Sequence, residues 1–275
     1  MDILKKLTEE FPSIREDRAQ NIINLIDEGN TIPFIARYRK EMTGSCDDQV
    51  LREFNDRLQY LRNLEKRKEE VASAITEQGK MTEEIQKALD AAATLTEVED
   101  IYRPYKQKKK TRASVAIERG LQPLADFILA QDKNADVRAE AEKYVDEEKG
   151  VATADEAIAG AKDIIAEIVS DDANVRKKLR NLFMKNGEIQ TKLVNADKEG
   201  AKTYEMYADY SEPVAEIKSH RVLAVNRGEK EDFLKVKVVF NDEIAKRIAG
   251  AGYLKDGGYS TELVKEAVDD GYDRL

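Results

Sequence analysis

The sequence contains no tryptophan and only one cysteine and one histidine among its 275 residues. A single cysteine excludes an internal disulfide scaffold, and without a Cys/His cluster the chain has no ligand set for structural zinc. No run of about 18 apolar residues occurs, and the start of the chain lacks the apolar stretch of a secretion signal. These absences predict a soluble, cytoplasmic protein that needs no cofactor or metal and does not enter a membrane.

Catalytic signatures are also missing from the sequence. It has no glycine-rich phosphate loop, no Ser/His/Asp spacing and no carboxylate cluster with metal-binding spacing. We therefore expect that this protein is not an enzyme.

The net charge of −9 is distributed unevenly along the chain. Residues 1–120 carry 22 basic and 23 acidic side chains, whereas residues 121–275 carry 24 and 32. Since the excess acid lies in the second part, clusters of cations in the first can present a positive field over a Debye length of about 8 to 10 Å. The negative net charge thus does not exclude a nucleic-acid partner.

The stretch 47–78 contains neither proline nor glycine, and its apolar residues recur three and four positions apart. This pattern predicts one helix of roughly 48 Å, at 1.5 Å per residue, that is capped by Ser45 and ends at Gly79. Its apolar stripe would face the protein body and its basic side would face solvent. The cations on the other faces are Arg52, Arg57, Arg62, Lys66, Arg67 and Lys68.

Two shorter helices are predicted before the long one. The first ends at Gly29, and Pro33 suits the first turn of the second, which runs to about residue 40. Two helices across a short turn with glycine form a helix-turn-helix-like unit. Its cations could contact nucleic acid, or they could pair with Glu41 or with the long helix, and spacing leaves both interpretations open. The candidate nucleic-acid-binding residues here are Arg37, Arg39 and Lys40.

Residues 103–112, which we call the basic segment, contain six cations and no acid. Lysine and arginine at this density suit contacts with phosphate groups, and a tyrosine among them can stack on a base. Alternatively, the segment is a solvated loop neutralised by Glu97, Glu99 and Asp100. Its candidate binding residues are Arg103, Tyr105, Lys106, Lys108, Lys109, Lys110 and Arg112.

Beyond residue 112 the pattern is mostly helical. Thr96 with Glu99, and Thr153 with Glu156, have the spacing of capping boxes that begin helices. Alternation predicts short strands at 189–193 and 234–238. A last helix starts near residue 260 and its apolar spacing shows no stop, so we expect further chain to follow.

The predicted fold class is mainly α: an elongated multi-helix assembly around one long helix, with a helix-turn-helix-like unit and a minor β element near the C-terminus. We predict three domains. They are a helix-turn-helix-like unit at 1–46, a helical region at 47–200 and a connecting segment at 201–275.

Several stretches of the sequence resemble one known family. They are TIPFIARYRKEMTG at 31–44, DIYRPYK at 100–106, IERGLQPLA at 117–125, AIAGAKDIIAE at 157–167 and HRVLAVNRGE at 220–229. In this order and at these distances they are similar to the N-terminal region of the bacterial Tex transcription accessory proteins. The resemblance covers most of the chain, and none of its motifs is a catalytic signature.

The resemblance implies a role in transcription. Full-length members of the family continue with an RNase-H-like domain, helix-hairpin-helix units and an S1 domain that binds RNA, and this sequence stops before all three. We expect a non-enzymatic module that associates with RNA or DNA independently of sequence, as a helical scaffold with phosphate-contacting patches. The alternative is a protein-docking scaffold on RNA polymerase or ribosome-associated proteins, with RNA binding confined to the S1 domain.

Overall fold

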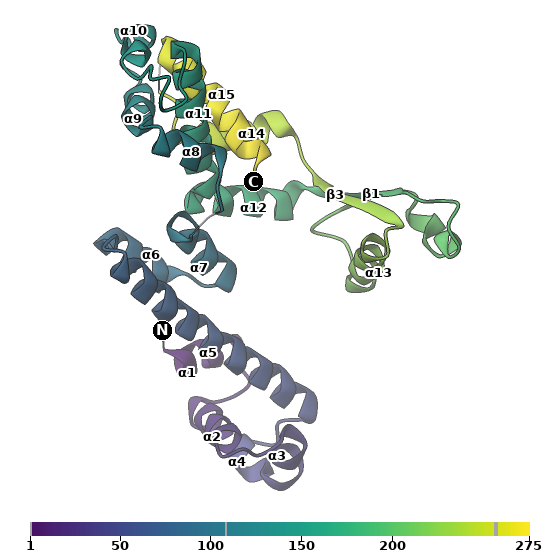
Figure 1. Ribbon diagram of the computed structural model, residues 1–275. Helices are drawn as coiled ribbons and strands as arrows, with labels where there is room; N and C mark the ends of the chain where they lie inside the picture. The colour runs from purple at the N-terminus through teal and green to yellow at the C-terminus, as the bar shows by residue number, and fades with distance from the viewer. Residues whose placement is uncertain (1, 108, 256–257) are drawn as a thin grey trace. The chain divides into compact units, whose positions relative to one another are not determined.

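The computed structural model describes residues 2–107, 109–255 and 258–275 (Figure 1). The fold is mainly helical with one small antiparallel sheet, which confirms the predicted mainly α class and its minor β element. Contacts divide the chain into two compact units, residues 1–105 and 106–275. The three domains expected from the sequence stay a prediction.

Unit 1 is built of helices around the long helix α5. Its elements are α1 (Ile3–Glu10), α2 (Glu16–Asp27), α3 (Ile32–Tyr38), α4 (Lys40–Thr43), α5 (Asp48–Glu77), α6 (Glu83–Ala91), α7 (Leu95–Tyr102) and the 3₁₀ helix η1 (Arg103–Tyr105). Leu51, Phe54 and Leu58 on the first half of α5 pack with side chains of α1, α2 and α3. Val71 and Ile75 on the second half pack with α6 and α7. The apolar stripe of α5 therefore holds two small cores, one along each half.

The predicted long helix is confirmed, but its predicted N-cap is wrong. The cap is Asp47, whose side chain accepts a hydrogen bond of 2.9 Å from the backbone N–H of Val50. Ser45 has a φ of 62°, in the left-handed region. An N-cap needs an extended backbone, so Ser45 belongs to the preceding turn.

One predicted N-cap is confirmed and another is displaced by two residues. Thr153 accepts from the backbone N–H of Glu156 at 3.2 Å, as predicted, and begins α11. The box expected at Thr96 is wrong, because α7 is capped by Thr94, which accepts from the N–H of Glu97 at 3.2 Å. Both threonines have an acid three residues later, so the local pattern could not choose between them.

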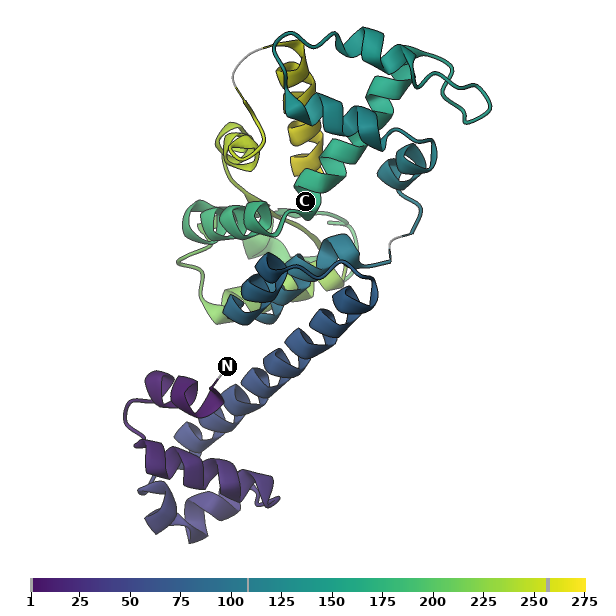
Figure 2. The same ribbon diagram turned by 90° about the vertical axis from the view of Figure 1, so that its left-hand side faces the viewer.

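The helices of unit 2 are α8 (Arg112–Glu118), α9 (Gln122–Ala130), α10 (Val137–Glu142), α11 (Ala154–Asp171), α12 (Ala173–Asn186), α13 (Ser219–Lys230), α14 (Asp242–Gly250) and α15 (Tyr259–Asp273), with the 3₁₀ helix η2 (Ala201–Tyr207). Five of them, α8, α9, α10, α12 and α15, pack against α11. Helix α15 lies along α11 in both views (Figures 1 and 2). A Cβ added at Gly271 of α15 would lie 2.7 Å from the carbonyl oxygen of Ala166. Glycine at this position therefore allows the two helix backbones to touch.

A three-stranded sheet completes unit 2. Strands β1 (Glu188–Leu193), β2 (Asp209–Pro213) and β3 (Leu234–Val239) pair antiparallel in the order β2-β1-β3. Tyr204 and Tyr207 of η2 pack with Val225 of α13 and Leu234 of β3, so these helices cover one face of the sheet. Strands β1 and β3 were predicted. Strand β2 was not, since its sequence DYSEP contains proline and no alternating apolar residues.

Candidate nucleic-acid interface

The first predicted group of cations lies at the junction of α3 and α4. Pro33 stands in the first turn of α3, and Ile35 is fully buried against α5. Burial of this residue turns the end of α3 outward, so that Arg37, Tyr38 and Lys40 are exposed. We call Arg37, Tyr38, Arg39 and Lys40 the α3–α4 patch.

Aromatic rings organise the α3–α4 patch. The guanidinium carbon of Arg39 lies 5.1 Å from the centroid of the Phe34 ring, and its Nη1 donates to the Tyr38 carbonyl at 3.0 Å. The Phe34 and Tyr38 ring centroids are 5.2 Å apart, and Tyr38 is 61% exposed. The ring of Phe34 thus positions one cation, while the neighbouring cations extend into solvent. This arrangement can contact phosphate groups and offer an aromatic face to a base.

The basic segment begins at the end of unit 1. Arg103 and Tyr105 form η1, and the ring of Tyr105 packs against the core along the second half of α5. The carbonyl oxygen of Tyr105 accepts a hydrogen bond of 3.0 Å from Nε2 of Gln78. Its aromatic side chain is therefore half-buried, which leaves less of the ring available for stacking than the sequence suggested.

The rest of the basic segment belongs to unit 2. Lys106, Lys109 and Lys110 are exposed, and Lys108 lies outside the described residues. Arg112, the first residue of α8, is held by two acids: its Nε lies 3.3 Å from Asp163 and its Nη2 lies 3.2 Å from Asp270. The charge of Arg112 is therefore paired with acids inside unit 2.

The two predicted groups are not brought together within unit 1. Ile35 of α3 packs beside Leu51 near the start of α5, whereas Tyr105 is bonded to Gln78 at its end. At 1.5 Å per residue, the intervening length of helix separates these positions by about 40 Å. Any nucleic acid that contacts both Arg37 and Arg103 therefore spans most of the long helix.

The expected basic side of α5 is corrected by the structure, because its arginines are bonded to acids. Arg57 makes two bonds to Glu10, and Arg62 makes two to Asp27 at 2.7 and 2.8 Å. The hydrogen bonds from Arg57 and Arg62 lower the pKa values of Glu10 and Asp27. Arg52, Arg67 and Lys68 pair with Asp48, Glu99 and Glu65 respectively. The cations of α5 are therefore paired within unit 1, and the ion pairs of Arg57, Arg62 and Arg67 connect α5 to α1, α2 and α7.

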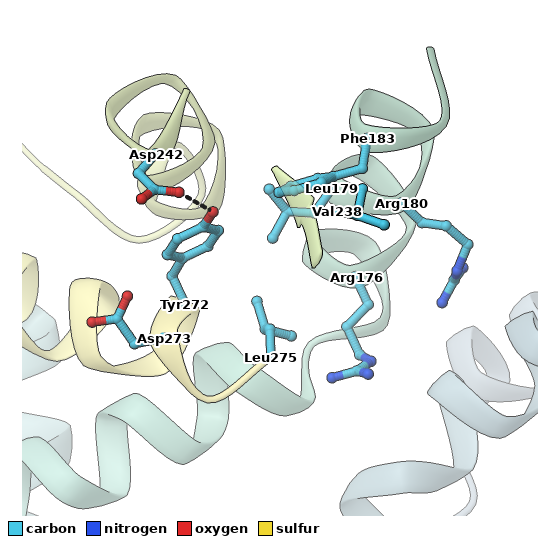
Figure 3. Close-up of a pocket in the computed structure, with 9 residues that line it drawn as sticks. All are labelled: Arg176, Leu179, Arg180, Phe183, Val238, Asp242, Tyr272, Asp273 and Leu275. Carbon is cyan, nitrogen blue, oxygen red and sulfur yellow. Dashed lines mark hydrogen bonds between the residues drawn. The ribbon is translucent and has the colours of Figure 1, made fainter. Parts of the chain in front are cut away.

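A pocket that the sequence did not reveal lies among α12, β3, α14 and α15 in unit 2 (Figure 3). Its volume is about 450 Å³, with Arg176 and Arg180 on one side and Asp242 and Tyr272 on another. The Tyr272 hydroxyl donates to Asp242 at 2.9 Å, and burial together with this bond raises the pKa of Tyr272 to about 12. The Tyr272 hydroxyl and the Asp242 carboxylate are therefore already bonded to each other. The sequence feature that could have indicated this pocket is the stretch that forms α12, which has five cations and no acid in its 14 residues.

Two kinds of site are missing from the described part of the chain. Its His, Cys, Asp and Glu side chains form no group of three or more that could hold a metal ion. None of its helices is long and apolar enough to cross a membrane.

Two family descriptions match this chain. Residues 1–76 match the Tex-like protein N-terminal domain, and residues 132–265 match the Tex central region-like family. One match lies in each of the two units, and together they cover more than half of the chain.

Three relatives illustrate the similarity. "Uncharacterized protein YdcI" of Bacillus subtilis (strain 168) is 44% identical over 275 residues, which cover 99% of this chain and 38% of that protein. "Transcriptional accessory protein Tex" of Neisseria gonorrhoeae is 41% identical over 243 residues, covering 88% of this chain and 32% of that protein. "S1 RNA-binding domain-containing protein 1" of Homo sapiens is 32% identical over 233 residues, covering 82% of this chain and 23% of that protein.

The chain thus spans less than two fifths of the length of each of these relatives. Both family matches carry the same family name, and a relative with 41% identity is named a Tex protein. The resemblance of the sequence motifs is confirmed, and this chain belongs to the Tex family.

Proposed function

We propose that this chain is a non-enzymatic, nucleic-acid-associated module of a Tex-type transcription accessory factor, working in the cytoplasm. It contacts phosphate groups with the α3–α4 patch and with Lys106, Lys109 and Lys110 of the basic segment. The supporting observation is a contrast: the arginines of α5 are bonded to acids, while Arg37, Lys40, Lys109 and Lys110 are exposed. Relatives named for transcription and for RNA binding are consistent with this role.

The contacts in this proposal do not read sequence. Lysine and arginine neutralise phosphates and release condensed counterions, a contribution that is the same for every base sequence. Tyr38, which is 61% exposed, adds a ring for stacking on an unpaired base. The module therefore binds single strands with a stacking contribution and duplexes through the backbone alone.

The test is the salt dependence of binding, measured by fluorescence anisotropy with a labelled single-stranded RNA and a labelled duplex DNA. Replacing Lys108, Lys109 and Lys110 by alanine should weaken binding equally for unrelated sequences. It should also reduce the salt slope by about 0.7 to 0.9 per lost phosphate contact. A matched control replaces three other exposed lysines by alanine: Lys202 in η2, and Lys218 and Lys230 at the two ends of α13. An unchanged slope in the basic-segment variant would remove that segment from the interface.

A protein-docking scaffold is the second candidate function, with RNA polymerase or a ribosome-associated protein as partner. It is favoured by two large apolar side chains in solvent, Met206 at 76% and Leu223 at 70% exposure. It is weakened by the neutralised arginines of α5, since these were the charges expected to dock on an acidic partner. If the chain binds neither RNA nor duplex DNA near physiological salt, this candidate replaces the first.

A further inference from the structure

The sheet of unit 2 has one covered face and one open face. The covered face packs on η2 and α13 through Ile189, Leu193, Leu234 and Val236. The alternate residues of the strands point the other way, and all of them except Val239 are exposed. Figure 1 shows α13 along the covered side of β1 and β3. The open face consists of Glu188, Gln190, Lys192, Asp209, Ser211, Pro213, Lys235, Lys237 and Val239.

Three lysines are concentrated on this open face. Lys192 of β1 lies directly opposite Lys235 of β3, and Lys237 follows two residues later on the same face. Opposite residues of an antiparallel pair have Cβ atoms about 4.5 to 5.5 Å apart, and alternate residues of a strand are about 7 Å apart. The three cations thus rise from one small area. Within the described residues, none of the three has an ion pair with an acid.

Acids occur on both sides of the sheet, but their partners differ. On the covered side, the acids are engaged by arginines: Arg221 donates to Glu212, and Arg227 lies 2.8 Å from Glu231. On the open side, Asp209 is the β2 neighbour of Lys192, and Glu188 is bonded to the hydroxyl of Ser211 at 2.9 Å. With three lysines against two acids, the open face has a small positive excess, and two of its three lysines stand on β3.

Protection of a sheet edge does not explain this pattern. Lysines on edge strands commonly prevent strands of different molecules from pairing, and β3 is an edge strand. Lys192, however, stands on β1, the central strand, which has no edge to protect. Like charges placed directly opposite destabilise a sheet, so the Lys192 and Lys235 pair carries a small cost to folding, which Asp209 on the other side of Lys192 offsets in part.

We propose that the open face of this sheet is a second phosphate-contacting surface, which holds the backbone of a nucleic acid through Lys192, Lys235 and Lys237. This inference rests on the proposed association of the chain with nucleic acid and adds a surface that the basic segment does not include. The open face carries no aromatic side chain, since Tyr207 and Tyr210 belong to the covered cluster. Its contacts are therefore with phosphate groups alone and do not depend on base stacking or base sequence.

The test compares two triple variants of the 275-residue chain. The open-face variant carries Lys192→Gln, Lys235→Gln and Lys237→Gln, and the control carries Lys202→Gln, Lys218→Gln and Lys230→Gln. Both remove the same charge from the same part of unit 2. The probes are two labelled duplex DNAs of unrelated sequence and a single-stranded RNA, with binding followed by anisotropy over a range of salt.

We expect the open-face variant to lose about 5- to 20-fold in affinity for both duplexes, with a salt slope smaller by up to about 2.7 for three phosphate contacts. The control should stay within about 2-fold of the parent chain. The melting temperature of the open-face variant should be unchanged or higher, since the change removes a like-charge pair. A structural role for the lysines would lower it instead.

Three outcomes would overturn the inference. Equal losses in the two variants would indicate a general charge effect. A parent-like affinity of the open-face variant, together with weaker binding by the Lys108, Lys109 and Lys110 variant, would reject the open face and leave the proposed function in place. Phosphatidylserine vesicles serve as a further probe: if the open-face variant loses vesicle binding while its nucleic-acid binding is unchanged, the lysines belong to a lipid surface. Weaker binding by the open-face variant alone would support the open face and reject the basic segment.

Discussion

The cations of α5 and those of the α3–α4 patch differ in what surrounds them. Arg57 and Arg62 on α5 each make two bonds to an acid from another helix, whereas Arg37 and Lys40 project into solvent. Both groups belong to unit 1 and look equally basic in the sequence. The comparison teaches that a positive surface is defined by the acids within reach of its cations, and that counting cations does not locate it.

The largest effect should come from the apolar stripe that holds α5 in place. Leu58 is 1% exposed in the core that α5 shares with α1, α2 and α3. Leu58→Ala should lower the free energy of unfolding of unit 1 by about 2 to 5 kcal/mol, because the cavity fills only partly. Urea unfolding monitored by circular dichroism measures this loss. Leu223→Ala, at a side chain that is 70% exposed, is the control and should change stability by less than about 0.5 kcal/mol.

A smaller loss of stability should follow removal of the paired arginines. Arg57→Ala with Arg62→Ala should cost roughly 0.5 to 2 kcal/mol in total, since partly exposed ion pairs contribute little even with two bonds each. Nucleic-acid affinity should stay close to that of the parent chain, because these guanidinium groups are already engaged. Urea unfolding measures the loss of stability, and fluorescence anisotropy on the same preparation measures the nucleic-acid affinity. A marked loss of affinity would show that α5 contributes to the interface after all.

The same ion pairs should make stability depend on pH. The bonds from Arg57 and Arg62 lower the pKa values of Glu10 and Asp27 from their ordinary 4.5 and 3.8. Below about pH 5 the unfolded chain therefore binds more protons than the folded one, and the stabilisation is lost as pH falls. Between pH 6 and pH 3 the parent chain should lose more stability than the double arginine variant. Parallel pH profiles would contradict this account.

The smallest effect on stability should be found at the α3–α4 patch. Arg37→Ala with Lys40→Ala should change the free energy of unfolding by no more than about 0.5 kcal/mol, because both side chains are exposed. The salt slope of nucleic-acid binding should fall by about 1 to 2, the contribution of two phosphate contacts. This variant removes the same charge as the double arginine variant of α5. If the two variants have the same effects, the contrast between paired and exposed cations is wrong.

The sequence predicted local structure well where one signal dominated. The absence of proline and glycine from 47–78 and the apolar spacing gave α5, and Thr153 with Glu156 gave the start of α11. It failed where two local patterns competed, as at Thr94 and Thr96. It also missed β2, whose strand structure depends on pairing with β1 and not on its own residues.

The candidate site was predicted less completely. The sequence located the exposed cations Arg37, Lys40, Lys109 and Lys110, because clusters of this kind are visible along the chain. It could not show that the ring of Tyr105 packs into a core or that Arg112 is held by Asp163 and Asp270. The open face of the sheet was missed for a similar reason, since Lys192 and Lys235 are neighbours only across paired strands.

By itself, the sequence determined the long helix, the mainly helical fold and the membership of the Tex family, because periodicity and motifs are read along the chain. The tertiary structure alone decided which cations remain exposed. Glu10 and Asp27 lie 47 and 35 positions away from the arginines they bind, and no local pattern connects them. Folding brings these acids to α5, whereas in the part of the chain that the structure describes no ion pair with an acid forms at Arg37, Lys40, Lys192, Lys235 or Lys237. A charge is neutralised by proximity in space, and proximity along the chain does not predict it.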